Sequence, residues 1–260
     1  MMQIILDGKY SAERSVVALG MFDGVHIGHQ VLLERGAALA KREGVPLVVC
    51  TFQDHPLRLI APEKCPPQLT DFDERARLME ALGVDVFYAM PFSPEVMTMP
   101  PEDYVGHLVR QFHPTDVVCG YNHTFGRKGE GKPPLLQVLG GALGFSVSIV
   151  PKITLEGREI SSTAIRAQLS GGNVAQARRL LGHPYEVRSQ SVQREKKSCS
   201  MLLQWGDKQR LPHGEYRALV CTGERMWPVT VRLQGDEAVC SLPSHLQAES
   251  VSLAFLAQPL

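Results

Sequence analysis

The sequence of 260 residues has no excess of charge of either sign, because 27 Lys and Arg residues balance 27 Asp and Glu residues. With a formal net charge of +0, no global field attracts nucleic acid or an anionic membrane surface, so neither is expected as a partner. No apolar run is long enough to cross a bilayer, and the run in MMQIILDGKY at the start is too short for a signal peptide.

Cysteine pairs of the C-x-x-C type are also missing, although the chain has 6 cysteines. Scattered cysteines in a chain of this size are expected to be reduced, small hydrophobic residues, which predicts a cytoplasmic protein. There is no internal repeat and no low-complexity tract. With 44% hydrophobic and 21% charged residues, a chain of this length is expected to form one large globular domain and one small one.

The chain is organised around the stretch VVALGMFDGVHIGHQVLL, residues 16–33. Its β-forming residues predict a strand up to the first glycine, and the apolar pattern after the turn predicts a helix. Such a turn directs free backbone N–H groups and the positive end of the helix towards a bound phosphate. Gly24 and Gly28 would let that phosphate approach closely, and His26 and His29 would lie on one side of the helix start. The alternatives are an ordinary turn with surface histidines, or a chance metal pair.

Further along, apolar runs of strand length alternate with helical patterns. The expected strands are 45–52, 84–90, 115–120 and 145–151, and the expected helices are 70–82, 101–112 and 135–143. This rhythm predicts a doubly wound α/β fold, a parallel sheet with helices on both faces. Ligands of such sheets bind beyond the carboxyl ends of the strands. His26, His55 and Asn122 follow such ends and are expected to line one crevice.

The segment ISSTAIR, residues 160–166, is expected to begin a further helix. Ser161, Ser162 or Thr163 would cap it. Arg166, in its first turns, would reach the phosphate that meets the cap hydroxyls. The alternative is a plain helix cap with a solvated arginine, which the segment on its own favours.

A helix over 174–181 ends this part of the chain near Tyr185, and the composition then changes. RSQSVQREKKS, residues 188–198, is polar and predicts a linker whose mixed charges are solvated. Strand-like runs separated by turn signals follow at 200–205, 215–221, 227–233, 238–242 and 250–256. They predict a small antiparallel barrel or sandwich. The predicted domains are therefore 1–186 and 187–260.

Four motifs, GMFDGVHIGHQ, TFQDHP, GYNHTFGRKGEG and ISSTAIR, occur in this order, and LLGHPYEV follows them. The combination resembles the FAD synthetase (FMN adenylyltransferase) module of the bacterial bifunctional riboflavin kinase/FAD synthetases, within the nucleotidylyltransferase superfamily. The resemblance covers residues 1–185 and implies a Rossmann-like fold. It also implies the reaction FMN + ATP → FAD + pyrophosphate, with Mg²⁺.

The resemblance implies a role for individual residues. His26, His29 and Arg166 are implied as catalytic, the two histidines at the ATP phosphates and the arginine at the leaving pyrophosphate. The implied ATP and phosphate contacts are Gly20, Phe22, Gly24, Gly28, Ser161, Ser162 and Thr163, and the implied flavin contacts are His55, Pro56, Asn122 and Arg127. No nucleophilic side chain is required, because the FMN phosphate attacks the α-phosphorus of ATP directly. A histidine beside several phosphate charges should have a pKa above its usual value of about 6.5.

The sequence departs from the usual pattern of the family at Met21, at Gln53-Asp54 and at His123-Thr124, where Asn, Glu-Pro and Phe-Arg are common. The departures bear more on flavin binding than on ATP binding. Two other functions stay open. One is a related nucleotidylyltransferase with another phosphorylated acceptor, such as a pantetheine or cytidylyl substrate, against which TFQDHP and the loop 121–134 argue. The other is a flavin-nucleotide sensor without turnover, against which the intact histidine pair argues.

In the family, the kinase domain follows the adenylyltransferase module directly, as the second domain does here. That kinase carries a segment similar to G-R-x-x-G-x-P-T-A-N, whose Thr and Asn help to bind metal and phosphates. The segment is missing here, and no Asn occurs after Asn173. The resemblance therefore implies a degenerate kinase-like barrel without riboflavin kinase activity. The alternative is that Asp207 or Asp236 has taken over the metal.

Overall fold

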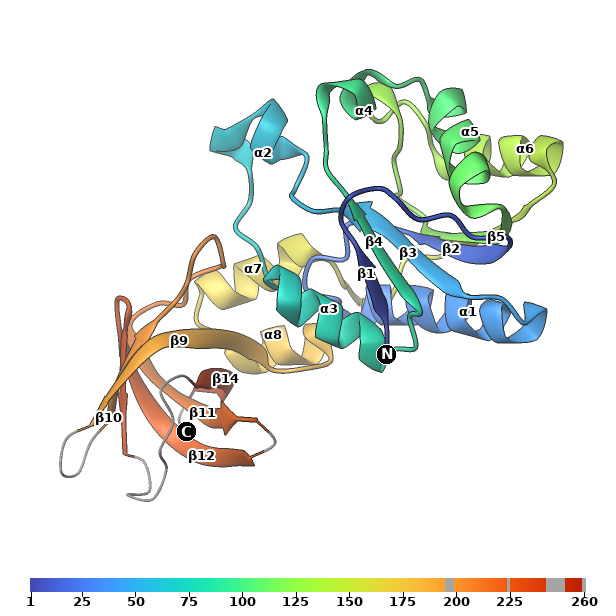
Figure 1. Ribbon diagram of the computed structural model, residues 1–260. Coiled ribbons are helices and arrows are strands. Elements are labelled where there is room, and N and C mark those ends of the chain that lie inside the picture. The colour runs from blue at the N-terminus through green and yellow to red at the C-terminus, as the bar shows by residue number, and fades with distance from the viewer. Residues whose placement is uncertain (195–198, 224, 242–250, 259–260) are drawn as a thin grey trace. The chain divides into compact units, whose positions relative to one another are not determined.

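The computed structural model describes residues 1–194, 199–223, 225–241 and 251–258 (Figure 1). It divides into two compact units, which we call the first unit (1–66 with 72–154) and the second unit (67–71 with 155–260). Residues 67–71 belong to the second unit because Gln68 pairs with Lys208 in a parallel bridge. In the described part of the chain, no helix has the length and apolar character needed to span a membrane.

The first unit is a parallel sheet of six strands in the order β1-β4-β3-β2-β5-β6. The strands are β1 (Gln3–Ile5), β2 (Ser15–Leu19), β3 (Leu47–Phe52), β4 (Val86–Met90), β5 (Pro114–Gly120) and β6 (Ser146–Val150). The helices are α1 (Ile27–Glu43), α2 (Leu57–Ile60), α3 (Phe72–Ala81), α4 (Pro94–Thr98), α5 (Pro101–Phe112) and α6 (Pro133–Leu143), with 3-10 turns η1 (Pro62–Lys64) and η2 (Arg127–Gly129). The predicted doubly wound parallel sheet is confirmed.

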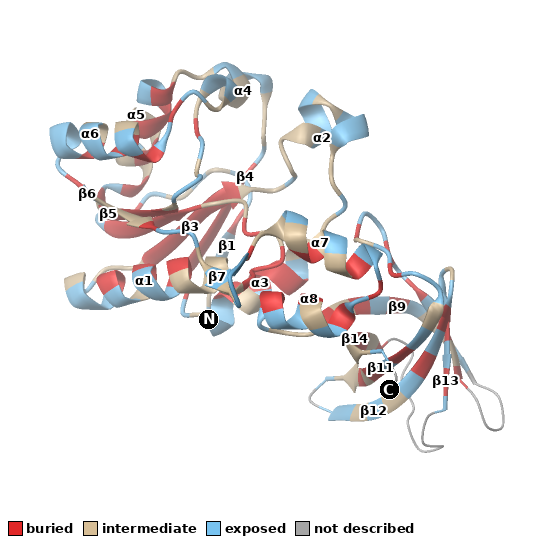
Figure 2. Ribbon diagram, turned by 180° about the vertical axis from the view of Figure 1, so that it is seen from behind, coloured by how far each residue is buried: buried red, intermediate tan, exposed pale blue. Residues whose placement is uncertain are grey.

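Both faces of this sheet are covered, and its inner strands β2, β3 and β4 are buried almost throughout (Figure 2). Successive side chains of a strand point to opposite faces. Leu19 and its neighbours on one face pack in a core cluster with Leu108 of α5 and with α6. Ala18 and its neighbours on the other face pack with Leu33 of α1 and with α3. This two-sided burial explains why the strands read as continuous apolar runs.

The order of the strands places a switch point between β2 and β5. From β2 the chain moves outward through β3 to β4, and it then returns to β5 on the other side of β2. In doubly wound sheets the ligand crevice forms at such a point, beyond the carboxyl ends of the strands. The carboxyl ends of β2 and β5 are therefore where a site is expected.

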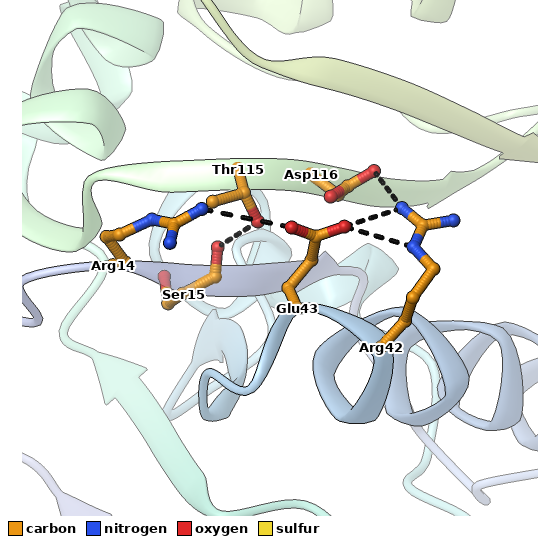
Figure 3. A network of polar contacts seen from close by, with 6 residues as sticks. All are labelled: Arg14, Ser15, Arg42, Glu43, Thr115 and Asp116. Carbon is orange, nitrogen blue, oxygen red and sulfur yellow. Dashed lines mark hydrogen bonds and ion pairs between the residues drawn. The ribbon is translucent and has the colours of Figure 1, made fainter.

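At the opposite end of β2 and β5, where these strands begin, charged side chains form a set of ion pairs (Figure 3). Glu43, at the end of α1, pairs with Arg14 at 3.8 Å and with Arg42 at 2.9 Å. Arg42 in turn lies 3.9 Å from the buried Asp116 of β5. Each pair is partly exposed and contributes little alone. Together they link the end of α1 to the starts of β2 and β5.

One strand of the sheet, β1, is missing from the sequence-based prediction. It has three residues, lies at the edge of the sheet beside β4, and buries only Ile5. Such a short, half-exposed strand leaves no periodic apolar pattern in the sequence.

The second unit contains a closed antiparallel barrel in the order β10-β13-β12-β11-β14-β9. Its strands are β9 (Tyr185–Arg194), β10 (Cys199–Leu203), β11 (Gly214–Thr222), β12 (Arg225–Gln234), β13 (Glu237–Cys240) and β14 (Ser252–Ala257). Before the barrel lie β7 (Thr154–Leu155) and β8 (Arg158–Glu159), paired in a two-stranded sheet, and the helices α7 (Ser162–Ser170) and α8 (Val174–Leu181). The prediction of a small β barrel is confirmed.

The predicted linker over 188–198 is wrong, because β9 continues to Arg194 and pairs with both β14 and β10. Tyr185, Val187 and Ser189 of this strand are buried in alternation. Ser189 occupies an inward position, and its Oγ accepts a hydrogen bond from Val251 N–H at 2.9 Å. Because this buried residue is polar, the strand does not show a regular alternation of apolar and polar residues in the sequence. The rest of the predicted linker, 195–198, and the predicted strand ends Leu242 and Ser250 lie outside the described residues.

Candidate active site

The turn between β2 and α1 holds the two histidines. His26 is the N-cap of α1, and its Nδ1 accepts a hydrogen bond from the His29 N–H at 3.3 Å. The neutral His26 ring therefore carries its proton on Nε2. The rings of His26 and His29 stack with their centroids 3.7 Å apart and their planes at 12°. The predicted placement of both rings on one side of the helix start is confirmed.

The backbone of this turn is strained. Phe22 has φ 54° and Val25 has φ 36°, and both side chains are fully buried. Residues other than glycine seldom adopt positive φ, and such strain clusters at functional sites. The Phe22 ring lies 5.2 Å from the His29 ring, centroid to centroid. Phe22 is buried as a whole residue, backbone included, so in this structure it presents no exposed atom to a phosphate.

Glycine at position 28 makes room for a side chain of the turn itself. A Cβ added to Gly28 would lie 3.2 Å from both Cε1 and Nδ1 of His26. This contact is tighter than ordinary van der Waals packing. Gly28 therefore allows the His26 ring to sit over the first turn of α1, in addition to any approach of a phosphate to the backbone.

A cavity of about 420 Å³ opens beyond the carboxyl ends of β2, β3 and β5. Of the residues predicted to bind ligands, Gly20, His29, Pro56 and Asn122 line it. His26, His55 and Arg127 are not among its lining residues. The cavity lies at the switch point of the sheet, where a doubly wound fold binds its ligand.

The wall of the cavity formed by β3, β4 and α5 is apolar and aromatic. Phe52 and Phe92 meet edge to face with centroids 5.0 Å apart, and Met90 and Tyr104 lie on the same wall. Cys50 also lines this wall, and burial raises the pKa of its thiol to about 12. A thiol with so high a pKa is not a nucleophile at neutral pH. The wall is therefore suited to binding a flat, apolar surface rather than to covalent chemistry.

Two buried histidine nitrogens belong to residues that line this cavity. Among the described residues, His29 Nδ1 and His123 Nε2 are buried and have no hydrogen-bond partner. Burial lowers the pKa of His29 well below its usual value, and the neighbouring His26 lowers it further. Burial also lowers the pKa of His123 to about 4. The protein's own groups thus keep both rings neutral, whereas a raised pKa is expected only beside phosphate charges.

The loop after β5 is folded tightly against α4 and α5. Phe125 pairs with Gly131 in an antiparallel bridge, and the Arg127 N–H donates to the Met99 carbonyl at 2.7 Å. Gly126 has φ 69°, and a Cβ there would lie 2.7 Å from Cα of Pro101. Only glycine fits at this position. The exposed Arg127 guanidinium pairs with Glu130 at 3.3 Å, outside the cavity lining.

His55 has a local role in the turn after β3. Its Nδ1 accepts a hydrogen bond from Leu57 N–H at 3.1 Å, and Pro56 is the N-cap of α2. Pro56 and Ile60 reach the cavity from this segment. His55 therefore holds the turn that carries these two lining residues.

Arg75 of α3 is a site residue that the sequence analysis missed. It is buried, and its guanidinium donates to the Met21 carbonyl at 3.3 Å and to the Gln53 carbonyl at 3.1 Å. Phe72 and Phe87 pack against the guanidinium, each with the ring centroid at 5.7 Å. Arg75 thus ties together the turns that follow β2 and β3. An arginine within an amphipathic helix gives no signal of this role in the sequence.

The remaining predicted residues lie in the second unit. Ser161 is the N-cap of α7, and its Oγ accepts a hydrogen bond from Ala164 N–H at 3.2 Å. Ser162 and Thr163 form the first turn of that helix. Arg166 donates through Nε to the Pro67 carbonyl at 2.6 Å. Of the three residues expected to cap this helix, Ser161 is the N-cap in the structure.

In the portion of the chain that the structure describes, no group of three or more His, Cys, Asp and Glu side chains is arranged to hold a metal ion. The chance metal pair considered for His26 and His29 therefore has no third protein ligand among these residues.

Comparisons with known proteins agree with these observations. The FAD synthetase family profile matches residues 9–164. The bifunctional riboflavin kinase/FMN adenylyltransferase of Listeria monocytogenes is 35% identical over 195 residues, which cover 74% of this chain and 62% of that protein. The protein of the same name from Bacillus subtilis is 31% identical over 73% of this chain and 60% of that protein. For Escherichia coli K12 the identity is 33%, over 69% of this chain and 58% of that protein.

The matched region thus spans less than two thirds of each of these relatives, at most 62%. A crystal structure described as a macrolide-efflux protein from Streptococcus pneumoniae superposes with a TM-score of 0.89 and 24% identity, covering 100% of this chain and 91% of that chain. At this identity the likeness shows the fold alone. The family profile covers more than half of the chain, and its match includes the cavity and both histidines. The chain therefore belongs to the FAD synthetase family.

Proposed function

We propose that this protein is an FMN adenylyltransferase, which transfers AMP from ATP to FMN and releases pyrophosphate. The cavity at the switch point of the sheet carries the proposal. It combines the start of α1 and His29, which suit phosphates, with an apolar aromatic wall, which suits the flavin ring. One site thereby offers a place for each substrate.

In the proposed reaction, an FMN phosphate oxygen attacks the α-phosphorus of ATP in line. A new P–O bond forms, the bond to the β-phosphate oxygen breaks, and pyrophosphate leaves. The protein has to position two anions and stabilise the charge that develops. His29, the proton on His26 Nε2 and the N–H groups of the first turn of α1 would donate hydrogen bonds to α- and β-phosphate oxygens.

The segment at the start of α7 would bind the other end of the triphosphate. Ser161, Ser162 and Thr163 supply hydroxyls and backbone donors, and Arg166 would stabilise the leaving pyrophosphate. The Nε–H of Arg166 is bound to the Pro67 carbonyl.

Mg²⁺ would enter with ATP as part of the substrate. Mg²⁺ retains several waters and is commonly held by substrate phosphates with one or two carboxylates. The described residues contain no cluster of three protein ligands, which agrees with a metal carried mainly by the nucleotide. When bound, the ion would neutralise phosphate charge.

For the flavin, we propose contacts from Pro56 and Asn122, which line the cavity. His55 and Arg127 would act less directly, by holding the turns that carry lining residues. The departures at Gln53-Asp54 and His123-Thr124 lie in these same turns.

We further propose that the barrel does not phosphorylate riboflavin. The P-T-A-N segment is missing, and no Asn occurs after Asn173. Asp236, one of the two candidate replacement ligands, forms an ion pair with Arg210. A carboxylate already paired with a guanidinium is a poor replacement for a metal ligand.

The test is to incubate the purified protein with FMN, ATP and Mg²⁺ and to measure FAD and pyrophosphate. Formation of both products in equal amounts supports the proposal. Pyrophosphate release with phosphopantetheine or a cytidylyl acceptor, but not with FMN, would indicate a related nucleotidylyltransferase. Binding of FMN without any product would indicate a flavin-nucleotide sensor.

A further inference from the structure

His123 has a nitrogen that the protein leaves unsatisfied at the wall of the cavity. Its Nε2 is buried and has no hydrogen-bond partner among the described residues, and the side chain lines the cavity. The other buried and unpartnered nitrogen at this cavity, His29 Nδ1, is assigned to the phosphates above. His123 lies in the loop after β5, and the phosphate contacts proposed above give its Nε2 no partner.

Leaving a buried polar atom without a partner destabilises a protein, because the atom has lost its hydrogen bonds to water. A phenylalanine of similar shape would avoid this cost. His123 therefore lowers stability unless something else completes its hydrogen bond. A ligand bound in the cavity would do so.

The aromatic rings around His123 indicate what kind of ligand would complete this hydrogen bond. The His123 ring stacks on Phe125 with centroids 6.0 Å apart and planes at 19°. Phe125 in turn stacks on Tyr104, with centroids 5.7 Å apart and planes at 29°. A column of aromatic rings at a cavity favours a flat ring system. Because burial keeps the imidazole neutral, Nε2 either donates or accepts a hydrogen bond, depending on the tautomer.

We propose that His123 is a specificity-determining residue whose Nε2 forms a hydrogen bond with the polar edge of the isoalloxazine ring of FMN. This inference rests on the proposed function, since it takes FMN as the substrate of the cavity. The pyrimidine edge of a flavin presents nitrogen and carbonyl groups in its ring plane, while its faces are apolar. A neutral imidazole beside stacked aromatic rings matches both features.

The test compares His123→Phe with the wild-type protein, and His107→Phe serves as the matched control. His107 lies on α5 in the same unit, is half-buried and does not line the cavity. His123→Phe keeps a planar ring against Phe125 and removes both nitrogens. We expect FMN to bind about tenfold more weakly to His123→Phe, as for the loss of one buried hydrogen bond, and ATP to bind as before. FMN binding to His107→Phe should be unchanged.

Thermal unfolding separates this role from a structural one. Since an unsatisfied nitrogen is removed, the Tm of His123→Phe should equal or exceed that of the wild type. Higher stability combined with weaker FMN binding is not expected of a residue that only supports the loop. A lower Tm together with unchanged FMN affinity would overturn the proposal.

Flavin analogues then locate the hydrogen bond. The probes are 1-deaza-, 5-deaza-, N3-methyl-, 2-thio- and 4-thio-FMN, each altered at one polar position. For the analogue that lacks the partner of Nε2, wild type and His123→Phe should bind equally. If every analogue loses the same factor as FMN, or if the loss falls on ATP, the proposal is wrong. A wild-type protein that binds no FMN would contradict the proposed function itself, whereas equal FMN binding by wild type and His123→Phe contradicts only this inference.

Discussion

His29 combines three features that a donor to phosphate oxygens requires. It lies in the first turn of α1, it lines the cavity, and its Nδ1 is buried without a partner among the described residues. We expect His29→Ala to lower the rate of adenylyl transfer by roughly 10²–10³, the usual effect of removing one preorganised donor to developing charge. That factor corresponds to about 3–4 kcal/mol of transition-state stabilisation. The measurement is FAD formation at saturating FMN and ATP.

Unfolding has to be followed in parallel, because His29 also stacks on His26. A His29→Ala protein that keeps the wild-type Tm and also keeps near wild-type turnover would show that His29 has no part in catalysis.

The low pKa of His123, about 4, predicts how stability depends on pH. In the unfolded chain this histidine takes up a proton near pH 6.5, whereas in the folded protein it stays neutral down to about pH 4. Between these values the unfolded state binds more protons, so the contribution of His123 to stability falls as the pH falls. The free energy of unfolding of His123→Phe, relative to wild type, should therefore rise from pH 7 to pH 4 and be constant above pH 7. A difference independent of pH would mean that the His123 ring takes up its proton at the same pH in the folded protein as in the unfolded chain.

Arg166→Lys tests the other phosphate-binding segment. Lysine keeps the charge but loses the planar fork, so it cannot reproduce both the Nε bond to Pro67 and a bidentate phosphate contact. We expect the KM for ATP to rise several-fold, with little change in FMN affinity. If FMN affinity falls instead and the KM for ATP is unchanged, Arg166 contacts FMN rather than the phosphates of ATP.

At the residue scale, the sequence predicted those features that depend on the spacing of residues close together in the chain. The pair His26 and His29 follows from a three-residue separation at a helix start. Side-chain chemistry predicted a helix cap at Ser161, Ser162 or Thr163, and the structure has it at Ser161. The roles of Arg75 and His123 depend on which distant backbone or cavity each side chain meets. No local pattern carries that information.

Among the elements, α3 has a role beyond covering the sheet, because its Arg75 binds the turns after β2 and β3. Arg75→Met removes both hydrogen bonds from the charged group and keeps much of the apolar stem. We expect the free energy of unfolding to fall by about 2–3 kcal/mol, with a loss of turnover as the Met21 turn loosens. Chemical denaturation and FAD formation measure the two effects.

Arg77→Met is the matched control, since Arg77 is exposed two positions along the same helix. Its effect on stability should be within about 0.5 kcal/mol. Equal effects of the two substitutions would show that the bonds to Met21 and Gln53 are not what stabilises the turns.

Helices and strands whose apolar residues follow a clear pattern were predictable from the sequence, and those without such a pattern were not. α5 is amphipathic and begins at Pro101, and β3 is a continuous apolar run, so both were found with nearly the right ends. β1 is too short to show a period. β9 buries Ser189 among its inward side chains, so its polar sequence resembles a linker. In both cases pairing with neighbouring strands, rather than local preference, decides the structure.

At the scale of the whole molecule, a parallel sheet bearing a nucleotide-type cavity is followed in the chain by a closed barrel. The predicted boundary between domains at residue 186 stays a prediction. By backbone contacts, α7 and α8 belong to the same compact unit as the barrel. The segment proposed to bind pyrophosphate thus lies in one unit and the histidine pair in the other.

We expect that this protein does not convert riboflavin to FMN. A kinase site acts mainly by positioning ATP, metal and acceptor, so we expect little catalytic power from a barrel whose sequence lacks the P-T-A-N segment. The matched relatives are named as bifunctional, but the match ends within this chain and covers at most 62% of them. The P-T-A-N segment is missing, and Asp236 is paired with Arg210. With riboflavin, ATP and Mg²⁺, chromatography should therefore show unchanged riboflavin, while the same preparation makes FAD from FMN. Appearance of FMN from riboflavin would show that another residue, with Asp207 the first to test by Asp207→Asn, has taken over the metal.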